Sequence, residues 1–142
     1  MLIYTKTQET YEAFEAELKG HFELDIRGPV SHYLGIEVEK GDGSYSIHQK
    51  SFIESAVTKF GLDKAKPKSS PAPPGSYLYA HDHPNSSAKP IDSTTYRSHI
   101  GTLQYPMTCT RPDICFSVIS ASQHLNTPNQ DHLTAARHIL TY

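Results

Sequence analysis

The sequence predicts an α+β fold in which a small antiparallel sheet or hairpin with a flanking helix is followed by a helical bundle. Two periodicities predict this order. Apolar and polar residues alternate through residues 32–49, as in half-buried strands, and the Gly-Asp-Gly at 41–43 supplies the turn of a hairpin. Elsewhere, apolar residues recur every three to four positions, as on one face of a helix. We therefore assign residues 1–50 to an α+β part and residues 51–142 to a helical part.

The α+β part begins with three predicted elements. Residues 2–4 are predicted as the end of a strand, and the alternating residues 21–26 as a second strand. Between them, a helix is predicted from its cap Thr7 to Gly20, which follows the last periodic residue. The apolar face of this helix contains Tyr11, Phe14 and Leu18.

Gly35 lies inside the first predicted strand of the hairpin, between Leu34 and Ile36. A glycine inside a strand marks either a close approach of another group to the backbone or a bulge. Both interpretations stay open from the residues alone.

The helical part begins with a short helix and a proline-rich connector. Residues 51–61 are predicted as a helix that starts with the capping box of Ser51 and Glu54 and ends at Gly61. Residues 64–90 contain six prolines and are predicted to be an extended connector that lies on a surface or is disordered.

Two or three further helices are predicted after the connector. Their caps are, in chain order, Asp92 or Ser93, then Thr110, and then Thr127 with Gln130 in a second capping box. The inward positions of the first of these helices are Tyr96, Ile100 and Leu103. The apolar pattern of the second is continued by Val118, Ile119, Ser122 and Leu125.

No catalytic constellation emerges from the sequence. It contains no phosphate loop, dinucleotide fingerprint or G-x-S-x-G elbow. His81, Asp82 and His83 could form one corner of a metal site, but the sequence places no third ligand. Cys109 and Cys115 are interpreted as two partly buried thiols in a reducing compartment. We expect no metal ion or other cofactor.

Charge is distributed unevenly along the chain. The formal net charge of −2 argues against binding nucleic acid by bulk charge alone. Residues 1–50 hold nine acids and five bases, whereas residues 51–142 hold six acids and eight bases, so a polyanion would prefer the second half. No apolar run approaches the roughly 20 residues of a membrane span, and no targeting segment is visible. We therefore expect no contact with a membrane and an intracellular location, either cytoplasmic or nuclear.

A series of motifs in residues 96–142 resembles the end of the reverse transcriptase region of copia-type LTR retrotransposon polyproteins. The family pattern Tyr-Arg-Ser-x-x-Gly-x-Leu-x-Tyr matches residues 96–105, and Thr-Arg-Pro-Asp-Ile matches residues 110–114. Asn-x-Pro at 126–128 and a helical pattern ending in tyrosine follow in the order of the family. The earlier segments HYLGIEVE, GSYSIHQK and FIESAVTKFGL resemble the family as well, so the resemblance extends essentially end to end.

The resemblance implies a place within a polymerase. In such enzymes a Tyr-x-Asp-Asp turn holds the two metal ions of nucleotide addition, and it stands immediately before a stretch like MLIYTKT. We therefore expect a non-catalytic C-terminal fragment of an RNA-directed DNA polymerase, the end of the palm plus the thumb, without the catalytic turn, although the parent enzyme would use Mg²⁺. Residues 32–49 would then resemble the primer grip, and the helices from residue 51 would resemble a thumb that binds an RNA or DNA primer–template duplex weakly.

The residues expected to contact nucleic acid combine this resemblance with the charge of the second half. They are Tyr33, Gly35, Lys50, Lys59, Lys64, Lys66, Lys68, Arg97 and Arg111. At Gly35, the resemblance favours close passage of a nucleic-acid backbone. Arg111 and Asp113 are interpreted first as a helix-start and packing motif, with contact to nucleic acid or to a partner as the second interpretation.

A second hypothesis is that a host has retained this retrotransposon-derived fragment as a protein–protein interaction module. Strands that pair with palm strands in the parent fold would leave a sheet edge open here, and open edges recruit other chains. We therefore expect a homo-oligomer, in its simplest form a two-fold dimer, or binding to another protein partner.

Overall fold

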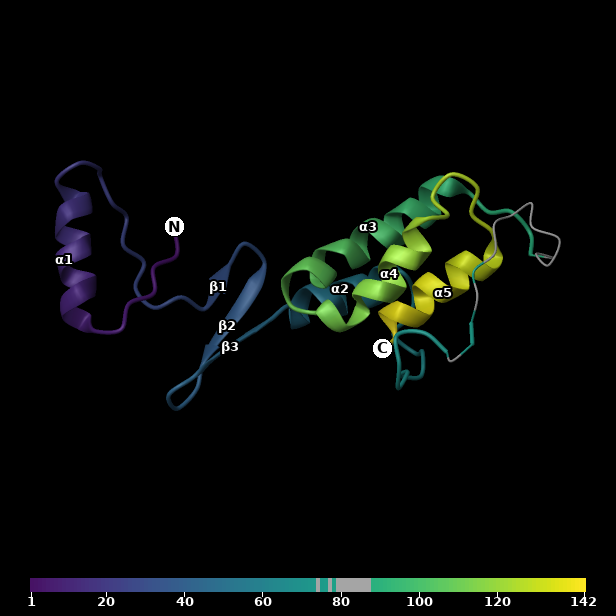
Figure 1. Ribbon diagram of the computed structural model, residues 1–142, viewed down its shortest axis with the longest axis horizontal. Coiled ribbons are helices and arrows are strands. Elements are labelled where there is room, and N and C mark those ends of the chain that lie inside the picture. The colour runs from purple at the N-terminus through teal and green to yellow at the C-terminus, as the bar shows by residue number, and fades with distance from the viewer. Residues whose placement is uncertain (74, 77, 79–87) are drawn as a thin grey trace. The chain divides into compact units, whose positions relative to one another are not determined.

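The computed structural model divides the chain into two compact units, Met1–Ile47 and His48–Tyr142 (Figure 1). The residues that it describes are 1–73, 75, 76, 78 and 88–142. The first unit contains one helix and most of a three-stranded sheet, and the second contains the helices that enclose the apolar core. The α+β class predicted from the sequence is confirmed.

The elements of the first unit are a helix and three short strands. Helix α1 (Gln8–Lys19) begins after Thr7, whose side chain accepts a hydrogen bond from the backbone N–H of Thr10, and it ends at Gly20, as predicted. The strands form one sheet in the order β1-β2-β3, and β1 pairs antiparallel with β2. The strands are β1 (His32–Tyr33), β2 (Ile36–Lys40) and β3 (Tyr45–His48).

A tight turn divides the first predicted strand at Leu34 and Gly35. Tyr33 pairs with Ile36, so Leu34 and Gly35 form the whole connection between β1 and β2. Their φ angles are 49° and 75°, and a two-residue hairpin loop with positive φ at both positions is the type I′ turn, which favours glycine. The expectation of a glycine within a strand is therefore wrong, and the turn itself accounts for Gly35.

Two of the predicted strands do not form. Residues 2–4 and residues 21–26 have no strand pairing. Alternation selects side chains that suit a strand, but the backbone donors and acceptors of a strand must also find a neighbouring strand. The sheet of the described residues consists of β1, β2 and β3 alone, which leaves these two segments without such a neighbour.

The Met1–Ile47 unit has no apolar core. None of these residues, all of which the structure describes, is buried. Even on the predicted apolar face of α1, Phe14 is 39% exposed, and the side chains of Phe22 and Ile47 are exposed as well. Because burial of apolar surface is the main driving force of folding, little within this unit stabilises it.

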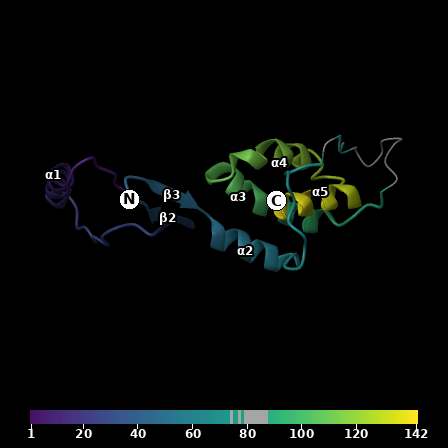
Figure 2. The same ribbon diagram turned by 90° about the horizontal axis from the view of Figure 1, so that it is seen from below.

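In its described residues, the His48–Tyr142 unit contains four helices and one short 3₁₀ turn. They are α2 (Lys50–Lys59), α3 (Ser93–Cys109), the 3₁₀ turn η1 (Pro112–Ile114), α4 (Cys115–Ser122) and α5 (Gln130–Leu140). Helix α3 packs on both α4 and α5, and α2 packs on α5. In Figure 2, α3 and α5 accordingly lie between α2 on one side and α4 on the other.

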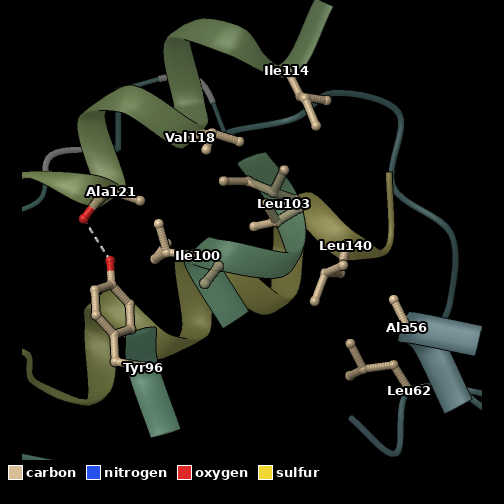
Figure 3. Packing of buried hydrophobic residues seen from close by; sticks show 11 residues of the cluster. Ala56, Leu62, Tyr96, Ile100, Leu103, Ile114, Val118, Ala121 and Leu140 are labelled. Carbon is tan, nitrogen blue, oxygen red and sulfur yellow. Dashed lines mark hydrogen bonds between the residues drawn. The ribbon is translucent and has the colours of Figure 1, made fainter. Parts of the chain in front are cut away.

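The apolar core lies between these helices (Figure 3). The predicted inward residues of α3 are all buried, and they belong to one apolar cluster with residues of α2, α4 and α5. The buried apolar residues are Ala56, Leu62, Tyr96, Ile100, Leu103, Ile114, Val118, Ala121, Ala136, Ile139 and Leu140. Ile119, predicted to continue the buried stripe beside Val118, is 50% exposed, because successive residues of an α-helix point about 100° apart.

The start of α2 differs from the predicted capping box. The helix begins at Lys50, so its N-cap is Gln49 and Ser51 lies within the first turn. Thr110, predicted to cap a helix, instead donates a hydrogen bond from its hydroxyl to Oε1 of Gln49 over 2.8 Å. This bond ties the start of α2 to the end of α3, and a sequence pattern cannot reveal it because 61 residues separate the two partners.

The N-cap predicted for α3 is correct, whereas the one predicted for α5 is not. Asp92 caps α3, as predicted, and its carboxylate accepts the backbone N–H of Thr95 over 2.8 Å. Helix α5 is capped by Asn129 rather than by Thr127, and the side chain of His132 closes a reciprocal capping box with it. The predicted cap lies two residues too early in the sequence. Asn129 directly precedes the first helical residue, and asparagine is among the best N-caps.

We predict that Tyr96→Phe lowers the free energy of unfolding by about 1 kcal/mol, the net value of one buried hydrogen bond. Tyr96 is fully buried, and its hydroxyl donates to the carbonyl of Ala121 over 2.7 Å. Urea unfolding monitored by circular dichroism measures this change. Tyr45→Phe, at a tyrosine that is exposed, is the matched control and should leave the urea midpoint unchanged. Equal midpoints for the wild type and Tyr96→Phe would show that the buried hydroxyl does not stabilise the unit.

Candidate nucleic-acid interface

Two of the predicted contact residues lie in the Met1–Ile47 unit. Tyr33 is half-buried at the end of β1, and Gly35 lies in the turn that follows. Leu34, between them, is 76% exposed, so the tip of this turn carries a large apolar side chain. The seven other predicted residues all lie in the His48–Tyr142 unit.

Lys64, Lys66 and Lys68 are exposed along the segment that follows α2. The residues between them, Ala65 and Pro67, line an apolar groove of about 330 Å³ whose other walls come from α2, α3 and α5. All five residues of this stretch are exposed, and the three lysines are not among the residues that line the groove.

Hydrogen bonds hold this segment beside the end of α5. The backbone N–H of Lys68 donates to the carbonyl of Thr141 over 2.8 Å, and Nε2 of His138 donates to the carbonyl of Ser70 over 3.0 Å. Arg137 is in the same last turn of α5 as His138, and it is half-buried. Helix α5 thus adds a base that the sequence analysis did not single out.

A stacked pair of rings lies next to Lys59, the last residue of α2. The ammonium of Lys59 is 5.2 Å from the centroid of the Phe60 ring, and that ring stacks on the imidazole of His99 at 3.8 Å and 24°. Burial lowers the pKa of His99, and the charges of Arg137 and Lys59 lower that pKa further, against the opposing hydrogen bond to the carbonyl of Thr95. The positive charges of both bases thus disfavour the protonated form of His99.

We define the basic surface by its five bases, which are Lys59, Lys64, Lys66, Lys68 and Arg137. Residues 58–70 contain one acid, Asp63, and its carboxylate accepts the hydroxyl of Thr58 over 2.7 Å. None of the ion pairs found among the described residues involves a base of this surface. Lys59 and Arg137 also have a structural role, because a cation in the last turn of a helix interacts favourably with the helix dipole.

Arg97 has partners within the protein rather than a free guanidinium. Its Nε donates to the carbonyl of Leu125 over 3.3 Å, and one of its terminal nitrogens donates to Oδ1 of Asn126 over 3.2 Å. Arg97 therefore fixes the loop between α4 and α5 to the first turns of α3.

Arg111 forms a two-pronged ion pair with Asp113. Its Nε and Nη2 donate to the two carboxylate oxygens over 3.0 and 2.8 Å, and its guanidinium lies 5.0 Å from the ring centroid of Tyr142. This hydrogen-bonded pairing raises the pKa of Arg111 and lowers the pKa of Asp113. The charge of Arg111 is thus neutralised beside η1, in agreement with the helix-start and packing motif that was the first interpretation of this pair.

The remaining predicted residue, Lys50, is exposed at the first position of α2. Lys59 is at the opposite end of the same ten-residue helix, roughly 14 Å away along the helix axis. Sequence reasoning missed Arg137 and His99. A base in the last turn of a predicted helix was the only available signal for Arg137, whose helix α5 packs on α2 and α3.

The structure also bears on metal ions and membranes. In the described parts of the chain, no three side chains of the His, Cys, Asp and Glu types are grouped so that they could hold a metal ion. His81, Asp82 and His83 lie outside the described residues. Cys109 and Cys115 are both free thiols of intermediate burial. None of the helices described is long and apolar enough to span a membrane.

Comparison with known proteins identifies the family. Residues 1–74, just over half of the chain, match the family model described as reverse transcriptase (RNA-dependent DNA polymerase). The chain belongs to this reverse transcriptase family. No solved structure gives a significant match.

The relatives place the chain within the reverse transcriptase region of copia-type retrotransposons, as the resemblance predicted. It is 30% identical to the retrovirus-related Pol polyprotein from transposon TNT 1-94 of Nicotiana tabacum, in an alignment that covers all of this chain and 11% of that polyprotein. It is 31% identical to the Pol polyprotein from transposon RE1 of Arabidopsis thaliana, over 88% of this chain and 8% of that polyprotein. An uncharacterized mitochondrial protein of the same plant is 29% identical over 89% of this chain and 50% of its own length. The chain thus spans about a tenth of the two polyproteins.

We predict that the protein loses stability as the pH falls below about 6.5, the usual pKa of an unfolded histidine. Burial lowers the pKa of His99 and that of His124, whose ring stacks on the buried His132 at 4.0 Å. The unfolded chain therefore takes up protons that the folded protein does not, and stability declines from the unfolded pKa down through the lower folded values. Urea midpoints measured at pH 7.5 and pH 5.5 test this difference.

His124→Gln should reduce this pH dependence, because it removes one of the two histidines. His21→Gln, at an exposed histidine of the Met1–Ile47 unit, is the matched control and should retain the dependence. A urea midpoint that stays constant between the two pH values would contradict the prediction.

Proposed function

We propose that the chain is a non-catalytic fragment of a copia-type reverse transcriptase that binds a primer–template duplex weakly through the basic surface. The observation that supports this best is that Lys64, Lys66 and Lys68 are all exposed on a segment held beside the end of α5, and none of the five bases takes part in an ion pair among the described residues. Phosphate contacts from lysine and arginine supply most of the sequence-independent affinity for nucleic acids. In this proposal the helical unit corresponds to the thumb, and the hairpin with Tyr33 corresponds to the primer grip.

The proposal assigns no polymerase activity to these residues. Two-metal phosphoryl transfer requires carboxylates that hold two metal ions a few ångströms apart. No two aspartates are adjacent in the sequence, and the described residues contain no group that could hold a metal, so the residues present do not fit the Mg²⁺ of the parent enzyme. Template-dependent primer extension by the pure chain in Mg²⁺ or Mn²⁺ would contradict this part of the proposal.

Weak rather than tight binding follows from the number of available bases. Arg97 and Arg111 are engaged with partners inside the protein, and the chain carries a formal net charge of −2. Each neutralised phosphate contributes about −0.9 to the slope of log affinity against log salt on duplex DNA. Five contacts therefore limit the slope to about −4.5, so the affinity should fall steeply between low and physiological salt.

We predict that replacing Lys64, Lys66 and Lys68 together by alanine weakens duplex binding and makes the salt slope shallower by about 2.7, the loss of three phosphate contacts. Fluorescence anisotropy with a labelled duplex, measured over a series of salt concentrations, gives both quantities. The control is a second triple alanine variant, at the exposed bases Lys6, Lys40 and Lys89.

Two results would contradict this assignment. Equal loss of affinity in both triple variants would mean that only total charge matters. Tight binding that persists in high salt would mean that a dedicated site exists outside the basic surface.

A second candidate function, a protein–protein interaction module, is supported by the exposed apolar side chains. Phe116 is 83% exposed and Ile119 is 50% exposed, three residues apart on the same face of α4. The Met1–Ile47 unit adds further exposed apolar residues and no buried ones, and β1 and β3 are the edge strands of its sheet. Exposed apolar patches and open sheet edges both commonly become interfaces.

We predict that the protein self-associates, with a mass above the 15.8 kDa of one chain at micromolar concentrations. Light scattering coupled to size-exclusion chromatography measures this over a range of concentrations. Changing Phe116 and Ile119 together to glutamate should favour the monomer if α4 is the interface, whereas Phe22→Glu changes the other unit alone. A monomer mass at every concentration would remove the support for this second candidate.

A further inference from the structure

We propose that two copies of this chain associate by placing helix α1 of each copy in the apolar groove of the other. The groove is the one that Ala65 and Pro67 line together with α2, α3 and α5. The proposal gives a partner and an interface to the second candidate function, protein–protein interaction, on which it rests. It does not require duplex binding. Reciprocal exchange of α1 closes the assembly as a two-fold dimer, so that no open chain of copies forms.

Helix α1 is amphipathic, and its apolar face is uncovered. Tyr11, Phe14 and Leu18 have the i, i+3 and i+7 spacing with which an amphipathic helix binds an apolar groove. No residue of α1 is buried, and Phe14 is 39% exposed. The helix contains four glutamates and one lysine, so its net charge is −3. The surface that suits α1 is therefore apolar with a basic border.

The groove of the helical unit has these properties. Its volume is about 330 Å³, and most of the residues that line it are apolar. Two of them, Ala65 and Pro67, lie on the segment that follows α2. Their neighbours in the sequence are the exposed lysines Lys64, Lys66 and Lys68. A backbone hydrogen bond from Lys68 to the end of α5 holds this segment in place. The segment that borders the groove thus carries three exposed positive charges.

Charge complementarity selects α1 as the occupant. Two charged side chains line the groove, and both have partners, since Arg111 pairs with Asp113 and Asp63 accepts the hydroxyl of Thr58. With three lysines and one aspartate, residues 63–68 have a net charge of +2. Helix α4 also has exposed apolar side chains, but it contains no charged residue. The groove segment and α1 have opposite charges, which favour their association and fix its orientation.

Phe14 and Glu17 are the residues of α1 best placed to contact the groove and its border. Phe14 is the middle residue of the apolar face, and aromatic side chains that fill a pocket supply much of the binding energy of an interface. Glu17 follows Phe14 by three positions, so it lies beside it on the helix surface, and it is exposed. Glu15, by contrast, pairs with Lys19 of the same helix. Glu17 is therefore the acid that we expect to meet the lysines.

Charge reversal on each side of the interface tests the proposal in the full chain. The groove variant carries glutamate in place of Lys64, Lys66 and Lys68. The helix variant carries Glu12→Lys and Glu17→Lys. All five positions are exposed, so neither variant disturbs a buried contact. Light scattering coupled to size-exclusion chromatography, over a range of concentrations, gives the dissociation constant of the dimer. Each variant alone brings like charges together and should raise this constant roughly tenfold or more. An equal mixture of the two variants restores opposite charges at both contacts and should recover the dimer.

The apolar contact is tested by Phe14→Ala, which should weaken the wild-type dimer by about tenfold or more. Phe22→Ala is the matched control, because Phe22 is an exposed phenylalanine of the same unit outside α1. It should leave the dissociation constant unchanged.

The outcomes separate this interface from the second candidate function. A wild-type protein that is monomeric at every concentration overturns both. A dimer that survives charge reversal on either side overturns the interface and leaves the second candidate function in place. A mixture of the two variants that stays monomeric also overturns the interface, because opposite charges have then been restored without effect. Recovery of the dimer in the mixture, together with the loss in Phe14→Ala, supports the exchange of α1.

Discussion

The buried side chain of Tyr96 connects the three helices on which the rest of the helical unit depends. It extends from α3 to the carbonyl of Ala121 near the end of α4, and its ring lies 6.1 Å from that of His132 in α5. Burying a phenol without a partner costs more than the bond contributes, so the position of Tyr96 is compatible with few alternative packings. Helix α2 and the lysine segment then pack on the surface that α3 and α5 form.

The two ends of α5 show how this packing separates structure from binding. At its start, Asn129 and His132 are almost completely buried and satisfy each other through the capping box. Its last turn carries Arg137 and His138, and receives the backbone of Lys68 through Thr141. The same helix therefore has a buried polar cap that fixes its position and a basic end that belongs to the basic surface. Position and charge are coupled, because a shift of the capped end would displace the bases.

Local patterns predicted the helices well and the strands less well, for a physical reason. The periodicity of α2 and α3 indicates which side chains each helix buries, and a helix satisfies its own backbone hydrogen bonds. Residues 21–26 alternate as a strand would, but the part of the chain that the structure describes supplies no neighbouring strand to pair with them. The alternation of apolar and polar residues continues through the turn at Leu34 and Gly35. A two-residue loop leaves a two-residue period unchanged, so the pattern alone does not reveal the turn.

In the candidate interface, too, neighbouring residues could be predicted from the sequence, whereas contacts between distant residues could not. Lys64, Lys66 and Lys68 were predictable because they are neighbours in the sequence and carry the same charge. A sequence pattern could not reveal all the partners of Arg97 and Arg111. Asn126 and Tyr142 approach these two arginines only in the folded chain. Phe60, which follows Lys59, is about forty residues from His99 in the sequence, and only the folded chain stacks its ring on that imidazole.

The opposite charges of the two halves limit what the basic surface can do. Nine acids in the first fifty residues repel the same polyanion that the five bases of the basic surface attract. Salt does not cancel these effects equally. At physiological ionic strength, interactions between exposed charges are screened beyond about 8 Å, so a distant acid loses most of its influence while a base in direct contact with a phosphate keeps more of its own. Contacts on the helical unit, rather than the net charge of the chain, would therefore determine any affinity that remains under those conditions.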